Sequence, residues 1–238
     1  PHARETVVDG KTQILADATE TGNGGSVVLW SDAFTGFGGL IRARGGANGG
    51  DGGFAEVSSK GVLGYNGQTI LTAARGAFGT LLLDPYNIII SDGATTTSPG
   101  PAFTPTADDS VINAGDLQTA LATANVTIST GDLTSGGSQA GNITIVPSAP
   151  LTWSAATTLT LDAYGNIAIG QAISAPAGGL TLQANGSITA TAAVNVGTFD
   201  LQGGAWAQSG TLPAFSATDF RLSGGSFLRV LGGDGSST

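Results

Sequence analysis

The chain has 238 residues, a length that suits one domain or one repeat array, and it carries a net charge of −9 with 39 glycines and no cysteine. The absence of cysteine excludes disulfides, thiol catalysis and thiolate metal sites. Because no Lys or Arg lies between Arg75 and Arg221, no basic face for nucleic-acid phosphates is expected.

Over residues 1–90, short strands separated by glycine clusters are predicted. Their centres lie roughly 12 to 15 residues apart, so two of them would make one coil of a stack. The cluster Gly49–Gly53 is typical of a corner between strands, where glycine supplies positive φ angles. The alternative is a calcium-binding turn of the nonapeptide type using Asp51, although tandem nine-residue repeats are missing. The predicted strands are Thr12–Asp17, Ser26–Trp30, Leu40–Ala43, Phe54–Val57, Gln68–Thr72 and Thr80–Leu83.

Residues 91–125 break this pattern and are interpreted as an insertion outside the stack, which covers an edge or separates two stretches of solenoid. Ser91–Asp109 is rich in Thr, Pro and Gly, as exposed loops are. Ala114–Ala124 has Leu and Ala at helical spacing and predicts a short helix. The loop contains the adjacent carboxylates Asp108 and Asp109, which are candidate binding residues or the acid and base of a polysaccharide hydrolase; a solvated loop is the main interpretation.

From position 126 to position 238, the chain repeats with a period of about 20 residues. An apolar–polar–apolar triplet recurs once in each period, and a second set of triplets runs in step with the first. Strands this short bury their apolar side chains only if successive coils stack with parallel strands about 4.8 Å apart. We therefore predict an all-β solenoid of about ten to twelve coils, a rod about 50 Å long. The triplets begin at Leu159, Leu180, Phe199 and Phe220, and those of the second set at Ile167 and Ile188.

Aromatic residues are the remaining candidates for recognition. Outward-facing Trp30, Trp153 and Trp206 on stacked coils would form a strip for a sugar or a protein, whereas packing in the core or at a corner is the main interpretation. Tyr65, Tyr86 and Tyr164 share this ambiguity. Three Asn-X-Ser/Thr triplets fit either glycosylation or a stack of asparagines at one corner of the coils, and they begin at Asn125, Asn142 and Asn185.

Three segments resemble those of filamentous-haemagglutinin-like exoproteins of Gram-negative bacteria, the substrates of two-partner secretion. They are Gly22–Asp32 (GNGGSVVLWSD), Ala43–Lys60 (ARGGANGGDGGFAEVSSK) and Gly79–Ser91 (GTLLLDPYNIIIS). The resemblance continues from Asp116 to Ser129. The residues after Ser129 share only the general character of the family's sequences. It implies a right-handed parallel β-helix, in agreement with the period above, and an outer-membrane transporter as partner of the parent chain. The start of the sequence lacks a basic-then-apolar signal sequence, so we interpret the chain as an internal fragment.

The resemblance and the repeat together predict a structural and binding segment of a secreted or cell-surface exoprotein. Such an adhesin-like rod would present loops to a host surface protein, a glycan or a neighbouring cell. A module that binds a host haem-carrier protein through residues 91–125 is the alternative, and a polysaccharide-active enzyme is the third possibility. We expect no catalytic residue, metal or cofactor, and we expect end-to-end self-association through unpaired strands.

Overall fold

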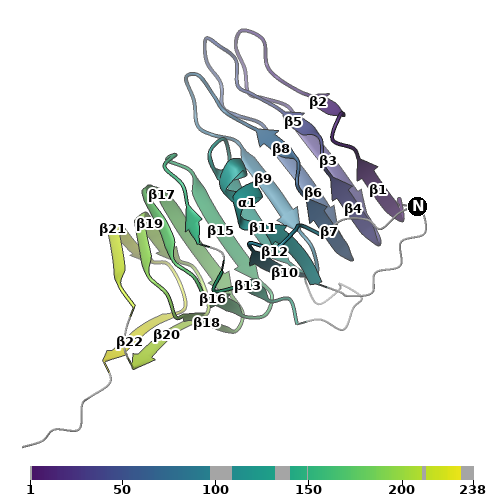
Figure 1. The fold of residues 1–238 in the computed structure, drawn as a ribbon. Coiled ribbons are helices and arrows are strands. Elements are labelled where there is room, and N and C mark those ends of the chain that lie inside the picture. The colour runs from purple at the N-terminus through teal and green to yellow at the C-terminus, as the bar shows by residue number, and fades with distance from the viewer. Residues whose placement is uncertain (1, 97–108, 132–139, 149, 211–212, 232–238) are drawn as a thin grey trace, which may run out of the picture.

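The computed structural model describes residues 2–96, 109–131, 140–148, 150–210 and 213–231. The chain forms a right-handed β-solenoid of about eight turns with one short helix (Figure 1). All pairings between its named strands are parallel, as when a chain winds repeatedly in one direction. The predicted fold class is confirmed.

One sheet runs along the whole rod, and we call it the spine sheet. Its strands follow the order β3–β6–β9–β12–β15–β17–β19–β21, and β14 also pairs with β17. Each strand in the order comes from the next coil, so this sheet sets the direction of stacking. The bounds are β3 (Ser26–Ser31), β6 (Phe54–Ser59), β9 (Thr80–Asp84), β12 (Asn125–Thr130), β14 (Leu151–Thr152), β15 (Thr158–Ala163), β17 (Ile173–Ala184), β19 (Val194–Leu201) and β21 (Phe215–Leu222).

The other sides of the solenoid consist of sheets that end near the middle of the rod. The sheets β1–β4–β7 and β2–β5–β8 belong to the first coils, and the sheet β11–β10–β13–β16–β18–β20–β22 belongs to the later ones. Their bounds are β1 (Glu5–Val8), β2 (Gln13–Leu15), β4 (Phe34–Phe37), β5 (Leu40–Arg42), β7 (Val62–Tyr65), β8 (Gln68–Ile70), β10 (Asn87–Ser91), β11 (Asp109–Asn113), β13 (Ile143–Ile145), β16 (Ile167–Ile169), β18 (Ser187–Ala190), β20 (Ala205–Gly210) and β22 (Ser226–Leu231).

The predicted register of the C-terminal coils is confirmed. Leu159 pairs with Leu180, Leu180 with Phe199, and Phe199 with Phe220. The interval between successive triplets in the sequence is therefore the length of one coil. In these strands the inward side chains alternate with outward polar ones, and Leu159 and Leu180 are fully buried.

The first coils are longer than those of the C-terminal part. Ser26 pairs with Phe54 and Phe54 with Thr80, which gives coils of roughly 25 to 30 residues. Each of these coils has three strands rather than the predicted two, and the missed strands in the complete coils are β4 and β7. Both contain a central glycine, Gly36 or Gly64, and their burial does not alternate. The longer coils explain why the chain makes fewer turns than expected.

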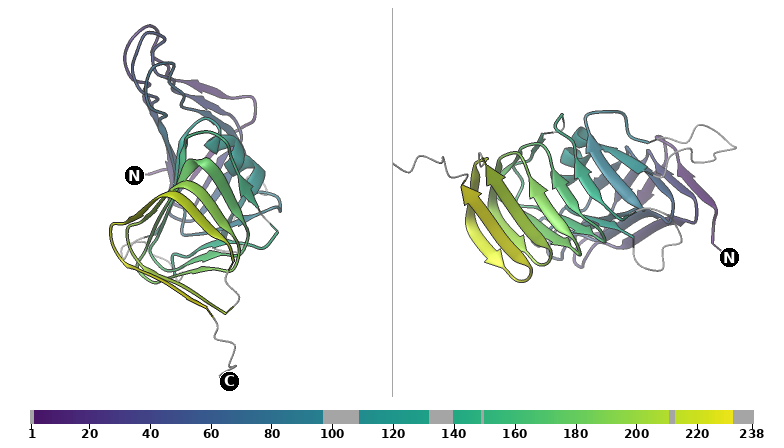
Figure 2. Two further views of the ribbon diagram at one scale, coloured as in Figure 1. Left: turned by 90° about the vertical axis from the view of Figure 1, so that its left-hand side faces the viewer. Right: turned by 90° about the horizontal axis from the view of Figure 1, so that it is seen from below.

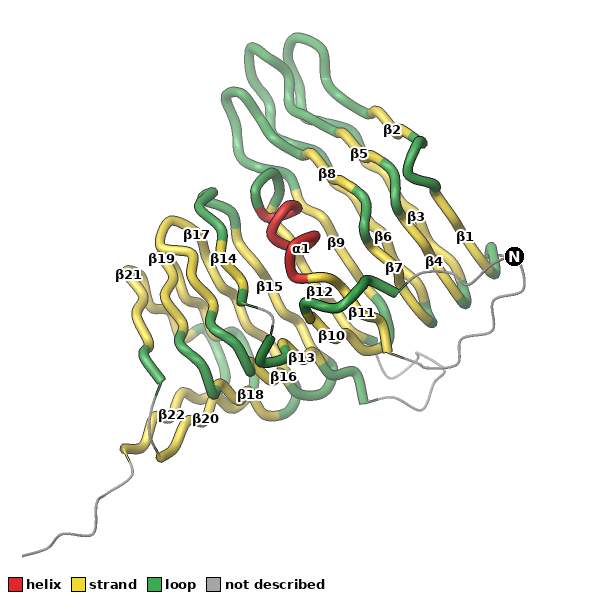
Figure 3. The backbone as a smooth tube through the Cα atoms, in the orientation of Figure 1, coloured by secondary structure: helices red, strands yellow, loops and turns green. Residues whose placement is uncertain are grey.

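The break in the side sheets is filled by β11 and by helix α1 (Ala114–Leu121). Asn113 caps α1, its side chain accepting the Gly115 N–H. The helix buries Leu117 and Leu121 in the same core as the strands, and it contacts β8 and β14 (Figure 3). The helix was predicted at the right place in the sequence, but its predicted position in the fold was wrong: α1 forms one side of a coil and does not lie outside the stack.

A ladder of side-chain amides joins successive coils at the entrance to the side sheet. Asn87 Oδ1 accepts the Asn142 N–H, Asn142 Oδ1 accepts the Asn166 N–H, and Asn166 Oδ1 accepts the Ser187 N–H, each at 2.8 Å. At the start of the ladder, Asn87 Nδ2 donates to Asp109 Oδ1 at 3.1 Å. These side chains replace backbone acceptors where the chain turns a corner.

We expect Asn166→Ala to lower the free energy of unfolding by about 1 kcal/mol, because it removes the acceptor of the Ser187 N–H. Urea unfolding of the variant measures this loss. Asn185→Ala is the control and should stay within about 0.5 kcal/mol of the parent, since no side-chain hydrogen bond of Asn185 occurs in the part of the chain that the structure describes. Equal stabilities of the two variants would contradict a structural role for the ladder.

Of the three asparagines that begin the predicted Asn-X-Ser/Thr triplets, only Asn142 belongs to the ladder. Asn125 makes its hydrogen bonds at another corner of the coil.

Candidate binding surface

Two of the three candidate tryptophans are packing residues. Trp153 is 5% exposed and its Nε1 donates to the Thr157 carbonyl oxygen at 3.1 Å. Trp206 is fully buried, and its ring lies 5.3 to 5.8 Å from the rings of Phe199, Phe215 and Phe227. Neither side chain is available for recognition at the surface. The prediction that the tryptophans pack in the core or at a corner is confirmed for both.

Trp30 lies partly exposed at the end of β3, and its ring already has intramolecular partners. The Lys60 ammonium lies 5.4 Å from the centre of the indole, and the His2 ring meets it edge-on at 4.7 Å. Lys60 also lies 3.8 Å from a carboxylate oxygen of Asp32. The adjacent hollow, which Tyr86 also lines, has a volume of only about 50 Å³. This corner therefore offers little unoccupied aromatic surface.

The structure describes only one member of the predicted carboxylate pair, Asp109. Asp108 lies outside the described residues. Asp109 is the first residue of β11, and its carboxylate accepts the hydrogen bond from Asn87 that begins the amide ladder. This contact supports a structural role for Asp109.

The most prominent feature of the surface is a fin that projects from the first coils (Figures 1 and 2). The fin consists of three stacked loops, residues 16–25, 43–53 and 71–79, which lead from β2, β5 and β8 to the next strand of the spine sheet. Each loop is one layer, with an arm that leaves the rod and an arm that returns to it. In the C-terminal coils the same connection is short, as at 176–178 within β17.

Backbone hydrogen bonds hold the layers of the fin together. On the outgoing arms the Ala18 N–H donates to the Arg44 carbonyl oxygen and the Gly45 N–H donates to the Thr72 carbonyl oxygen, at 2.9 and 3.0 Å. On the returning arms the Gly52 N–H donates to the Ala77 carbonyl oxygen at 2.9 Å. The layers thus continue the stacking of the rod beyond its strands, with a parallel bridge between Thr21 and Gly49 and an antiparallel one between Gly50 and Arg75, which makes the fin a rigid extension.

Glycine is required where the two arms of a layer or of neighbouring layers touch. A Cβ atom on Gly24 would lie 2.1 Å from the Ala43 carbonyl oxygen, and one on Gly52 would lie 1.8 Å from the Leu71 carbonyl oxygen. At the tip, Gly49 and Gly50 have φ angles of 153° and 115°, which favour glycine. Within this cluster Gly49 and Gly50 alone have positive φ angles, and the predicted plain corner is wrong, because the cluster belongs to a projecting arm.

A second side-chain ladder follows the returning arms. Asn23 Oδ1 accepts the Asp51 N–H and Asp51 Oδ1 accepts the Ala77 N–H, both at 2.8 Å. The calcium-binding alternative needed the Asp51 carboxylate as a ligand, and here one of its oxygens binds the next layer. Among the described residues, no three His, Asp or Glu side chains are grouped to hold a metal ion.

An ion-pair cluster fixes the base of the outgoing arms. Asp17 Oδ2 lies 2.6 Å from Arg42 Nε and 3.0 Å from Arg44 Nη2. Burial of the Asp17 carboxyl opposes its ionisation, but the hydrogen bonds from Arg44 and Arg42 and the charge of Arg44 prevail and hold the pKa of Asp17 below its ordinary value. Because both arginines are partly exposed, this cluster orders the first two layers more than it stabilises the fold.

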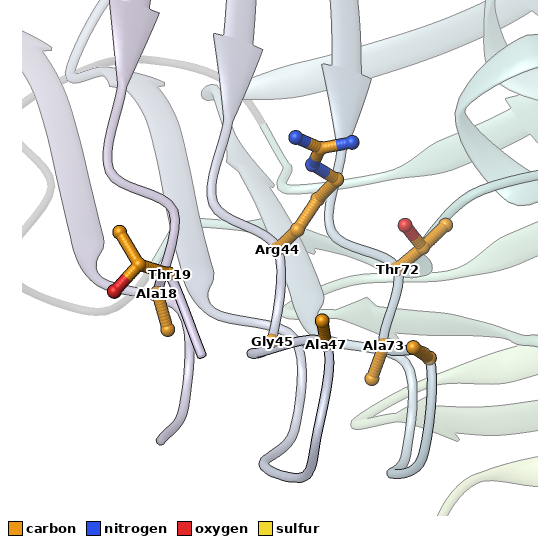
Figure 4. Close-up of a pocket in the computed structure, with 8 residues that line it drawn as sticks. Ala18, Thr19, Arg44, Gly45, Ala47, Thr72 and Ala73 are labelled. Carbon is orange, nitrogen blue, oxygen red and sulfur yellow. The ribbon is translucent and has the colours of Figure 1, made fainter. Parts of the chain in front are cut away.

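A shallow hollow of about 310 Å³ runs across the outgoing arms of all three layers (Figure 4). It presents alanine methyl groups, threonine hydroxyls and the Arg44 side chain. Sequence reasoning missed the fin because its glycines were assigned to corners; the repeated pair Gly24–Gly25 and Gly52–Gly53 was the visible sign that equivalent loops stack. The lining residues are Ala18, Thr19, Arg44, Gly45, Ala47, Thr72, Ala73 and Ala74.

Comparisons with known proteins give no identification: no protein-family model matches the chain, and no curated protein matches it. Within the described residues, no helix combines the length and the apolar character needed to cross a membrane.

Proposed function

We propose that the chain is a binding segment of a secreted or surface-exposed bacterial exoprotein, in which the solenoid is the rigid support and the fin is the element presented to the partner. The observation that carries the proposal is the fin itself. Its three equivalent loops project in register and are held together by backbone hydrogen bonds. In the later coils a short connection joins the equivalent strands, so the solenoid itself does not need such long loops. Loops positioned by a rigid scaffold are where proteins place their binding residues.

The composition and the resemblance described above support an extracellular rod. The core is continuous from Val27 to Trp206, so stability comes from stacking and not from disulfides. The segment 109–125 is less suited than the fin to be the presented element, since β11 is paired to β10 and α1 buries Leu117 and Leu121. We therefore expect the contact region in the fin instead of in residues 91–125.

The test compares the chain with a variant whose fin is shortened. Residues 17–24, 44–52 and 72–78 are each replaced by Pro-Ala-Gly, the short connection that the chain itself uses at 176–178. Both proteins are screened against host cells, matrix proteins, serum carrier proteins and a glycan array. We expect a specific target of the parent chain to be lost in the variant, by ~10-fold or more in affinity.

Circular dichroism and thermal unfolding confirm that the shortened variant keeps its solenoid. A target bound equally well by both proteins would contradict the proposal, because the binding residues would then lie elsewhere on the rod. Turnover of a glycan by either protein would favour the enzyme alternative instead.

A further inference from the structure

The fin has an open edge in the middle of the rod. The coil after the third layer does not continue the fin, because α1 ends at Leu121 and the chain enters β12 at Asn125. That coil reaches only the base of the layer, where the Leu71 N–H donates to the Thr123 carbonyl oxygen and Asn125 Nδ2 donates to the Phe78 carbonyl oxygen. The outer part of the layer, residues 72–77, has no fourth layer beside it among the described residues.

The hydrogen bonds show which backbone groups face the open edge. In parallel stacks, successive residues direct their N–H and C=O groups to opposite neighbours. Thr72 accepts a bond from the second layer, while Leu71 donates to the coil on the other side. Ala73 therefore directs its N–H as Leu71 does, toward the open edge, just as the Gly45 N–H of the second layer points to the third.

The returning arm gives the same result independently. Ala77 bonds to the second layer through both its N–H and its carbonyl oxygen, while the Phe78 carbonyl oxygen bonds to Asn125 on the other side. Gly76 therefore faces the open edge as Phe78 does. The two arms thus present the Ala73 N–H and the backbone groups of Gly76, none of which has a hydrogen-bond partner within the described residues.

The usual protections of a free edge are sparse here. Charged side chains, proline and bulges commonly block such edges, whereas residues 72–77 are Thr-Ala-Ala-Arg-Gly-Ala, with Arg75 as the one charge. Residues 74–77 are exposed. The edge does not depend on where the sequence begins or ends, since coils lie on both sides of it.

We propose that this edge binds an extended, glycine-rich strand of a partner protein, which adds to the fin as a fourth layer. Strand addition supplies affinity through main-chain hydrogen bonds and specificity through the space available to side chains. The inference rests on the proposed role of the fin as the presented element and names the class of its partner.

The spacing between the existing layers shows why the partner strand must be rich in glycine. A Cβ atom on Gly76 would lie 2.3 Å from the Gly50 carbonyl oxygen, and one on Gly79 would lie 2.0 Å from the Gly53 carbonyl oxygen. These contacts join the third layer to the second. If a fourth layer stacks at the same spacing, a Cβ atom at its positions equivalent to Gly76 and Gly79 would collide with the backbone of the third layer. Bulky residues are therefore excluded at these two positions of the partner strand.

The test uses hydrogen exchange of the wild-type chain followed by NMR, with a peptide of residues 43–53 (ARGGANGGDGG) as the probe, because this sequence already forms a layer of the fin. We expect the amides of Ala73 and Gly76 to exchange at least ~10-fold more slowly with saturating peptide. The amides of Gly45 and Gly52, which are bonded within the fin, serve as internal references and should be protected throughout.

A matched peptide in which Gly50 and Gly53, the positions equivalent to Gly76 and Gly79, are replaced by valine should give no protection. Any of three results would overturn the inference. These are no protection by the glycine-rich peptide, equally strong protection by the valine peptide, and protection confined to Thr19 at the opposite edge of the fin. Fin-dependent binding of a target without protection by the peptide would overturn strand addition and support the proposed function. Protection by the peptide, with a target that binds equally to the fin-shortened variant, would support strand addition and overturn the proposed function.

Discussion

Replacing Gly52 by alanine is expected to lower the free energy of unfolding by about 2–3 kcal/mol and to disorder the fin. The new Cβ would lie 1.8 Å from the Leu71 carbonyl oxygen and 2.4 Å from the Gly79 nitrogen. Both atoms belong to the backbone of the third layer, so no side chain can rotate away to relieve the contact. The layer must move as a whole, and that movement breaks the bond from the Gly52 N–H to the Ala77 carbonyl oxygen.

Urea unfolding and amide exchange measure this change, and Gly10→Ala is the matched control. A Cβ on Gly10 would lie 3.4 Å from the Gly38 carbonyl oxygen, an ordinary contact, so we expect a change within about 0.5 kcal/mol. In Gly52→Ala the Gly45 amide should lose its protection while the Leu182 amide in the C-terminal coils keeps its own. If the two variants were equally stable, close packing of backbones would not be what holds the fin.

The register of the C-terminal coils could be predicted because coil length and hydrophobic period coincide there. In each coil from Leu159 onward the strands are joined by short connections, so equivalent positions recur at a nearly constant interval of about 20 residues. Inward Leu, Ile and Phe at positions such as Leu180 and Phe199 then mark one face of each strand. A period of this kind is visible in a single sequence.

The fin could not be predicted because its layers are defined by backbone contacts that leave no hydrophobic pattern. Gly24 and Gly52 are conspicuous in the sequence, but glycine is equally common at corners, and only the distance to Ala43 or Leu71 shows that two arms meet. The strands β4 and β7 were missed for a related reason. Phe34 is buried although it neighbours the buried Thr35, so burial on both faces removes the alternation by which a strand is recognised.

The place of α1 could not be predicted because a helix can cover a solenoid or replace one of its strands with the same amphipathic sequence. Leu117 and Leu121 lie at helical spacing in either case. What differs is the partner of the buried face. Here it is the interior of the rod, and α1 contacts β8 of the preceding coil and β14 of the following one. The polar side of the helix carries Thr119, whose hydroxyl donates back to the Gly115 carbonyl oxygen.

Replacing Leu117 by alanine is expected to lower the free energy of unfolding by about 2–4 kcal/mol, because the side chain is fully buried and its removal leaves a cavity. Thr119→Ala, on the polar side of the same helix, is the control and should change stability by about 0.5 kcal/mol or less. A near-neutral Leu117→Ala would contradict the position of α1 in the core and favour an external insertion.

The way in which Leu117→Ala unfolds should also differ from that of the parent chain. In a solenoid each coil is stabilised by its neighbours, so the weakest junction decides where cooperativity is lost. The middle of the rod is such a junction: the side sheet is interrupted between β7 and β11, where the Leu63 N–H donates to Ser110 Oγ in place of a backbone ladder. With α1 weakened, only the spine sheet joins the two stretches firmly.

Tryptophan fluorescence can follow the two stretches separately, because Trp30 lies in the first and Trp153 and Trp206 lie in the second. Urea unfolding is recorded in a Trp30→Phe background and in a Trp153→Phe/Trp206→Phe background, each with and without Leu117→Ala. We expect the two backgrounds to give coincident transitions when α1 is intact and separate transitions after Leu117→Ala. Coincident transitions in both cases would contradict this expectation, because the spine sheet alone would then couple the two stretches.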